Sequence, residues 1–132
     1  MIKKIDHIGI AVNSIDQALK LYTEVLGLSL KEIEVVEEQH TRTAILPVGE
    51  SKIELLESTD AESPIARYIE KFGEGIHHLA LEVADIEDAL NKVSQSGLQL
   101  IDEKPRQGVE NTRIAFLHPK GTGRVLLELV QS

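Results

Sequence analysis

The sequence predicts an α+β fold made of two tandem βαβββ modules, whose curved mixed sheets form an open barrel-like cavity. Three observations support this prediction: an internal repeat, a change from strand to helix periodicity within each half, and small residues beside a histidine on the first strand of each half. The length of 132 residues suits one compact domain, or two very small fused halves, with room for a core. Within the domain 1–132 we expect repeat 1 at about 4–58, a linker helix at about 63–73 and repeat 2 at about 75–131.

The repeat consists of four motifs that occur in the same order and at nearly the same spacing in both halves. The matched pairs are Ile5–Val12 with Ile76–Val83, Ile15–Leu19 with Ile86–Leu90, Gly27-Leu28 with Gly97-Leu98, and Ile53–Leu56 with Leu127–Val130. Four ordered matches are hard to obtain by chance, so we interpret the chain as two copies of one module.

In the first module a strand at about 4–12 precedes a helix at about 15–26. Ser14 and Gln17 fit a capping box at the start of this helix, and Gly27 follows its end. One face of the helix is apolar and is formed by Ile15, Ala18, Leu19, Tyr22 and Leu26. The remaining strands of this module are expected at about 29–37, 41–47 and 51–57.

A short helix is expected between the modules, because Ser63-Pro64 is typical of a helix start and Gly73 of a helix end. In the second module, Asp85 is the expected cap of the helix. The strand, the helix and the three further strands are expected, in order, at about 76–83, 86–96, 98–102, 112–117 and 124–131. The polar segment Lys104–Asn111 is expected to be a loop that can move over a site.

The composition narrows the class of function. The chain has 14 Lys and Arg against 22 Asp and Glu, a net charge of −8, which argues against a nucleic-acid partner. It has no cysteine, which excludes disulfides, thiolate metal sites and cysteine nucleophiles. It has neither an apolar run long enough to span a membrane nor a signal-peptide core after Met1. We therefore expect a cytoplasmic protein, without a membrane partner, that acts on a small molecule or binds another protein.

Two histidines and two glutamates at matching positions of the repeat are the candidate functional residues. His7 and His78 lie on the first strand of each module, and Glu54 and Glu128 lie within the apolar last strands. A carboxylate among apolar residues must be paired, protonated or bound to a metal. A lone histidine on a strand is more often a hydrogen-bonded core residue, but a pseudo-two-fold axis between the copies would bring all four residues to one centre. Such a donor set suits cobalt, manganese, nickel, zinc or ferrous iron.

Four motifs carry a family resemblance. They are Asp6–Val12, Gly49–Glu57, Gly75–Ala80, and Phe116–Lys120 followed by Val125–Leu129. At these residues the sequence resembles the vicinal-oxygen-chelate superfamily and, within it, the methylmalonyl-CoA epimerase family. The first and third motifs are shared across the superfamily, whereas the Phe-Leu-His-Pro-Lys segment with its downstream glutamate is more specific to the epimerases. The resemblance covers nearly the whole chain and implies the vicinal-oxygen-chelate fold.

The resemblance also implies a cofactor and a reaction. The cofactor is one divalent metal ion, cobalt(II) foremost, held by His7, Glu54, His78 and Glu128. The reaction is the interconversion of (S)- and (R)-methylmalonyl-CoA by removal of the α proton through a metal-stabilised enolate. Glu128 is then both a ligand and a catalytic acid/base.

Inversion at carbon requires a second acid/base group on the opposite face of the substrate. The family has a glutamate on the third strand, where an ungapped alignment puts Thr43, or Arg42 if the strand shifts by one residue. Glu37, Glu38 or a metal-bound water are the alternatives.

An acyl-CoA substrate is an anion, and the protein itself is acidic, so its binding must rely on local cations. The candidates cluster in the second module and are Lys104, Arg106, Arg113, Lys120 and Arg124. Small members of the superfamily usually pair, so the resemblance also implies a homodimer.

Three other functions stay open at this point. Glyoxalase-type lyases, such as lactoylglutathione lyase, use four nitrogen and oxygen ligands and similar enolate chemistry. Ring-cleaving dioxygenases use two histidines and one carboxylate around iron, and a fourth ligand at Glu54 argues against that class. A metal-free small-molecule-binding protein of the same fold would not need the matched set of histidines and glutamates.

Overall fold

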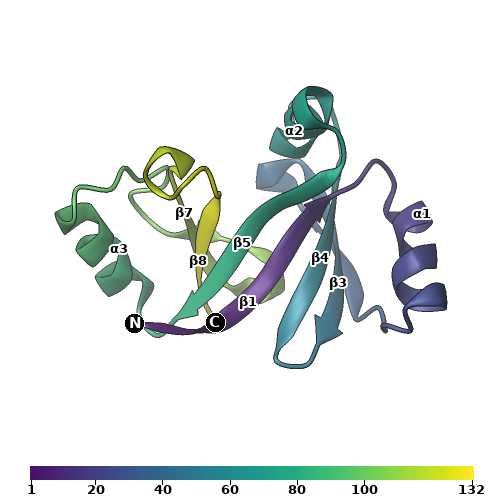
Figure 1. Ribbon diagram of the computed structural model, residues 1–132, viewed down its shortest axis with the longest axis horizontal. Helices are drawn as coiled ribbons and strands as arrows, with labels where there is room; N and C mark the ends of the chain where they lie inside the picture. The colour runs from purple at the N-terminus through teal and green to yellow at the C-terminus, as the bar shows by residue number, and fades with distance from the viewer. The chain divides into compact units, whose positions relative to one another are not determined.

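The computed structural model describes residues 1–132 and shows the predicted element order twice (Figure 1). Apart from single helical turns, each half runs strand, helix and three strands, and α2 (Pro64–Phe72) connects the halves. This order confirms the predicted α+β class. The chain divides into two compact units: unit 1 comprises Met1–His7 with His78–Ser132, and unit 2 comprises Ile8–His77. Strands β1 (Ile2–Ala11) and β5 (Gly75–Val83) each contribute residues to both units.

Unit 2 is built on an antiparallel sheet with the strand order β2-β3-β4. Its strands are β2 (Glu32–Val36), β3 (Thr41–Val48) and β4 (Ser51–Ser58). Leu55 packs with Val12 and Ile15 in one core cluster, whereas its neighbour Leu56 packs with Ala11 and Ile65 in another. Successive residues of a strand point to opposite faces, so α1 (Ile15–Leu19) covers one face of β4 and α2 covers the other.

The helix predicted over 15–26 is correct in position but not uniform. Ser14 caps α1 as predicted, accepting a hydrogen bond from the backbone N–H of Gln17, and the chain then widens into the π-helical segment η1 (Lys20–Val25). The hydroxyl of Thr23 donates to the carbonyl of Leu19 at 2.6 Å. Such back-bonding competes with the regular backbone ladder, which gives a physical reason for the wider turn.

Unit 1 holds a mixed sheet with the order β5-β8-β7-β6, made of β6 (Arg106–Gln107), β7 (Arg113–Leu117), β8 (Leu127–Gln131) and β5. β5 and β8 are parallel, and the other pairs are antiparallel. Helix α3 (Ile86–Gln95), capped by Asp85, covers one face with a core that includes Ile86, Leu90, Ala115 and Leu129. In Figure 1 α3 lies beside β7 and β8.

The strand predicted at 98–102 is wrong. Only Leu100 bridges to β7, opposite Leu117, and the short strand β6 lies instead within the segment predicted to be a loop. The backbone N–H groups of Ile101 and Asp102 both donate to the Phe116 carbonyl, and the Asp102 carboxylate accepts the Phe116 N–H. The Ile101 bond belongs to the bridge at Leu100, but the Asp102 carboxylate takes the Phe116 N–H that a longer ladder would pair with a backbone carbonyl, so the ladder ends there.

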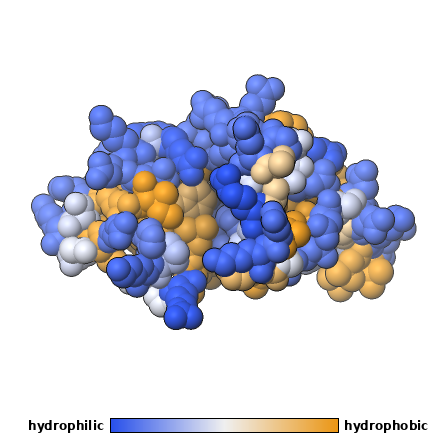
Figure 2. Space-filling model, turned by 90° about the horizontal axis from the view of Figure 1, so that it is seen from above, coloured by the Kyte–Doolittle hydropathy of each residue, from blue (hydrophilic) through white to orange (hydrophobic).

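The surface is mostly hydrophilic, as expected for a chain with 14 Lys and Arg and 22 Asp and Glu. On the face shown in Figure 2 hydrophilic residues cover most of the area and hydrophobic residues form separate patches. None of the helices has both the length and the apolar character needed to cross a membrane.

Candidate metal centre

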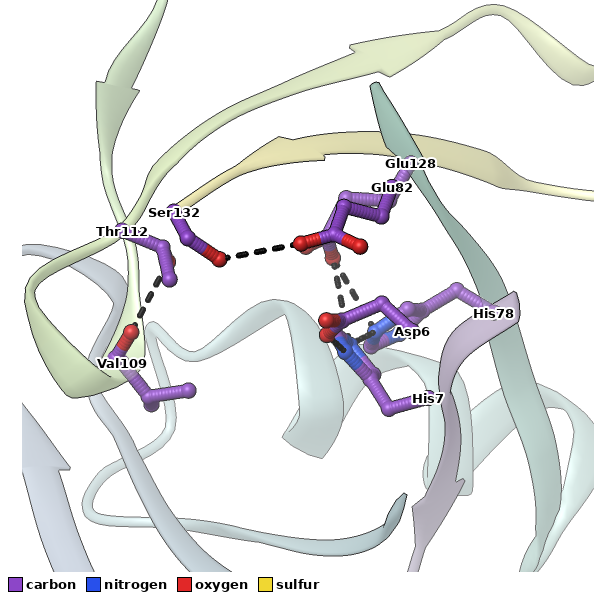
Figure 3. A network of polar contacts seen from close by, with 8 residues as sticks. All are labelled: Asp6, His7, His78, Glu82, Val109, Thr112, Glu128 and Ser132. Atoms are coloured by element: carbon purple, nitrogen blue, oxygen red, sulfur yellow. Dashed lines mark hydrogen bonds and ion pairs between the residues drawn. The ribbon is translucent and has the colours of Figure 1, made fainter. Parts of the chain in front are cut away.

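Three of the four predicted ligands converge in unit 1. His7 from β1, His78 from β5 and Glu128 from β8 point toward one another, and all three are buried (Figure 3). The two histidine Nε2 atoms are 2.9 Å apart. Oε1 of Glu128 lies 3.1 Å from Nε2 of His78 and 3.7 Å from Nε2 of His7. We call these three residues the histidine–glutamate cluster.

Strand register explains how β5 and β8 place two members of this cluster, His78 and Glu128. Glu128 lies opposite Ala80 on one side and opposite Phe116 on the other. His78 is two residues before Ala80 and therefore shares its face of the sheet. The small side chain at Ala80 leaves room beside the carboxylate, and the Phe116 ring meets the His78 ring edge to face, with centroids 5.5 Å apart. This pairing points Glu128 to the face that carries His78.

Asp6 is a site residue that the sequence did not reveal. Its Oδ2 atom lies 2.6 Å from Nδ1 of His7, and both side chains are buried. A carboxylate that accepts the Nδ1–H bond leaves the Nε2 lone pair of the ring facing the cluster. Alternation along the strand predicts that Asp6 and His7 face opposite sides, so no periodic signal could have paired them.

The cluster keeps Glu128 in its charged form. Burial by itself would raise the pKa of the Glu128 carboxyl, but the charge that His78 carries when protonated and hydrogen bonding from His7 and His78 outweigh burial. The net result is a pKa well below the ordinary value for glutamate. The described polar contacts of Glu128 run through Oε1, which leaves Oε2 able to accept a proton.

The donor atoms of the cluster fit a divalent cation. Atoms bound about 2.1 Å from one ion lie about 3.0 to 3.4 Å from one another at octahedral or tetrahedral angles. Of the three separations between donor atoms, 3.1 Å lies within this range, 2.9 Å just below it and 3.7 Å above it. Two lone pairs at the His7–His78 distance would repel each other, so a proton or a cation must lie between these nitrogens. Buried imidazole and carboxylate donors suit the first-row metals predicted from the sequence.

The fourth predicted ligand, Glu54, belongs to unit 2. It is buried on β4, opposite Ile45 of β3. The predicted positions of the second acid/base also lie in unit 2. Thr43 is buried on β3, whereas Arg42 binds Glu57 at 3.2 Å, and neither offers a carboxylate. The alternatives Glu37 and Glu38 lie in an exposed single turn, η2 (Glu37–Gln39).

The chain matches one known family along most of its length. Residues 6–116 match the model of the Glyoxalase/Bleomycin resistance protein/Dioxygenase superfamily. The chain belongs to this superfamily. The resemblance predicted from the four motifs is thereby confirmed, and the first and third motifs, which carry His7 and His78, lie within the matched residues.

Individual relatives narrow the assignment. The chain is 43% identical to the uncharacterized protein YqjC of Bacillus subtilis (strain 168), over 97% of this chain and 91% of that protein. It is 34% identical to the mitochondrial methylmalonyl-CoA epimerase of Dictyostelium discoideum, over 97% of this chain and 78% of that protein. A solved methylmalonyl-CoA epimerase in complex with methylmalonyl-CoA and NH4+ has a TM-score of 0.97 and 37% identity, covering 100% of this chain and 96% of that one. The predicted relationship to this class of isomerase is confirmed.

Proposed function

We propose that the protein is a metal-dependent epimerase that interconverts (S)- and (R)-methylmalonyl-CoA. The observation that carries the proposal is the convergence of His7, His78 and Glu128 in a chain that resembles methylmalonyl-CoA epimerases over nearly its whole length. The predicted homodimer and cytoplasmic location remain predictions.

His7, His78 and Glu128 would hold the metal ion, with Glu54 as the fourth ligand. The support for Glu54 is its burial and its match to Glu128 in the repeat. When bound, a divalent cation supplies positive charge where negative charge develops on the substrate oxygen as the α proton leaves. Cobalt(II) is the first candidate by family resemblance, and manganese, nickel, zinc and ferrous iron suit the same donors.

The proton transfer falls to Glu128. Its carboxylate lies in the cluster, its described contacts run through Oε1, and Oε2 has no described partner that would block a proton. Glu128 therefore removes the α proton on one face of the substrate and, in the reverse direction, returns a proton to that same face, while a second group serves the opposite face. The second acid/base group, which acts on the opposite face of the substrate, is not a carboxylate of the third strand, because this chain has Thr43 and Arg42 at the candidate positions.

The decisive test is exchange of the α proton of methylmalonyl-CoA in deuterated water, followed with and without a chelator. We expect exchange by the metal-loaded protein and a loss of about 10²- to 10⁴-fold in Glu128→Gln, because general acid/base catalysis contributes about that much. His78→Ala should lose both bound metal and exchange. His77→Ala is the matched control, since His77 packs against the Tyr68 ring instead of joining the cluster.

Two outcomes would reject the proposal. Full exchange by chelator-treated His78→Ala protein would exclude the metal-dependent mechanism. Turnover of a glutathione hemithioacetal in place of methylmalonyl-CoA exchange would assign the cluster to a glyoxalase-type lyase.

A further inference from the structure

Arg106 lies at the rim of the site in unit 1. It pairs with Ile114 across the β6–β7 ladder, and side chains directly opposite each other in a ladder share one face of the sheet. Ile114 and Phe116 pack in one core cluster with Ala80 and Val130, on the face that also carries His78 and Glu128. The guanidinium carbon of Arg106 lies 5.5 Å from the centroid of the Phe116 ring.

The guanidinium of Arg106 is fixed by an ion pair at Nε but still has N–H groups left to donate. Its Nε atom lies 3.3 Å from Oδ1 of Asp102, while the other oxygen of Asp102 accepts the Phe116 N–H at 2.8 Å. Asp102 thus ties Arg106 to β7, and the Phe116 ring supports the guanidinium by a cation–π contact. The described contacts leave the two Nη groups available, and the side chain is 40% exposed.

We infer that Arg106 is an anion-binding arm of the site, whose Nη groups bind an anionic oxygen of the acyl-CoA. This inference rests on the proposed function for its ligand. A guanidinium fork that is already held at Nε and supported by an aromatic ring loses little freedom when it binds a carboxylate or a phosphate. Because the chain carries a net charge of −8, a local cation on the site face is needed to attract such a ligand.

The structure separates Arg106 from the other candidate arginine on the neighbouring strand. Arg113 lies one position before Ile114, so its side chain points to the opposite face of β7. There it binds Glu87 of α3 at 2.9 Å. Arg113 therefore offers a matched control with the same change of charge, close in the fold but on the wrong face of the sheet.

Two ligands distinguish the two possible anions. Free CoA carries phosphates and no acyl carboxylate, whereas methylmalonyl-pantetheine carries the carboxylate and no phosphate. We would titrate each into the metal-loaded protein by calorimetry. For Arg106→Gln we expect the Kd of one ligand to rise at least about tenfold, the effect of losing one charged hydrogen bond. Arg106→Lys and Asp102→Asn should give smaller rises, and Arg113→Gln should leave both Kd values unchanged.

Each result has one meaning. A weaker affinity confined to CoA assigns the phosphates to Arg106, and one confined to methylmalonyl-pantetheine assigns the carboxylate. Unchanged affinities for both ligands in Arg106→Gln and Arg106→Lys, or an equal loss in Arg113→Gln, would overturn the inference. Binding of CoA is measured without turnover, so it tests the role of Arg106 separately from the epimerase activity. An affinity that depends on Arg106 in a protein that shows no α-proton exchange would support the anion-binding role of Arg106 and reject the proposed function.

Discussion

The Asp6 carboxylate lies 2.6 Å from Nδ1 of His7, its immediate neighbour in the chain. Through this contact the ring presents Nε2 to His78 and Glu128, so a residue outside the cluster sets the direction of a ligand inside it. Two adjacent residues thus act together, one as the proposed ligand and one as the residue that positions it.

Replacement of Asp6 is therefore expected to weaken metal binding without removing a ligand. We expect Asp6→Asn to lower the affinity for cobalt(II) by about 10- to 100-fold, the usual cost of losing a carboxylate that orients a histidine ligand. Competition with a chromophoric chelator measures this affinity directly. Asp16→Asn, a change on the exposed first turn of α1, is the control. An unchanged affinity in Asp6→Asn would show that His7 needs no such support.

Metal binding should also stabilise the fold. A ligand that binds only the folded state at about 100 times its Kd adds about 2.7 kcal/mol to the free energy of unfolding. We therefore expect cobalt(II) to raise the Tm of the unaltered protein and a chelator to reverse the change, as followed by circular dichroism. His78→Ala should show no metal-dependent change in Tm. An equal shift in His78→Ala would place the stabilising metal away from the cluster.

The turn that precedes β7 is tightly packed at Gly108. A Cβ atom added at Gly108 would lie 2.7 Å from Cγ2 of Ile114 and 2.8 Å from Oγ1 of Thr112. We expect Gly108→Ala to lower the free energy of unfolding by about 1–3 kcal/mol, as overpacking usually does. Urea denaturation measures the change. Gly75→Ala is the control, because the nearest atom to its added Cβ is 4.0 Å away, and a similar loss there would argue against a steric cause.

The pKa of Asp60 should depend on His40. The side-chain hydrogen bond from His40, with help from the Glu62 backbone N–H, lowers the pKa of Asp60 below its ordinary value. A pKa that is lower in the folded state means that the bond stabilises the fold above the unfolded pKa of Asp60. This contribution is lost as the pH falls through the folded pKa.

His40→Ala should therefore raise the pKa of Asp60 toward its ordinary value, as measured by carboxyl-carbon NMR titration. The stability difference between His40→Ala and the unaltered protein should shrink in acid. His118→Ala is the control, since His118 accepts the Lys120 N–H in a different turn. An Asp60 titration that does not move in His40→Ala would contradict the assigned cause.

The repeat and the strand alternation were enough to predict most of the fold and most of the cluster. Duplication matched His7 to His78, and the pairing of β5 with β8 places Glu128 on the same face as His78. These signals are visible in the sequence because periodicity depends only on neighbouring residues and on the side of the sheet that is buried. The match of Glu54 to Glu128 is of the same kind, and the role of Glu54 stays a prediction.

Some contacts join residues that neither the repeat nor the strand periodicity relates. The tertiary structure alone decided these contacts. The Asp102 carboxylate took the Phe116 N–H and left a single bridge at Leu100 where a strand was expected at 98–102, and β6 formed where a loop was predicted. The same pairing turned Arg106 toward the site face and Arg113 toward α3, although the two arginines look alike in the sequence. Such choices depend on which strand pairs with which and in what register, and this information exists only once distant segments have come together.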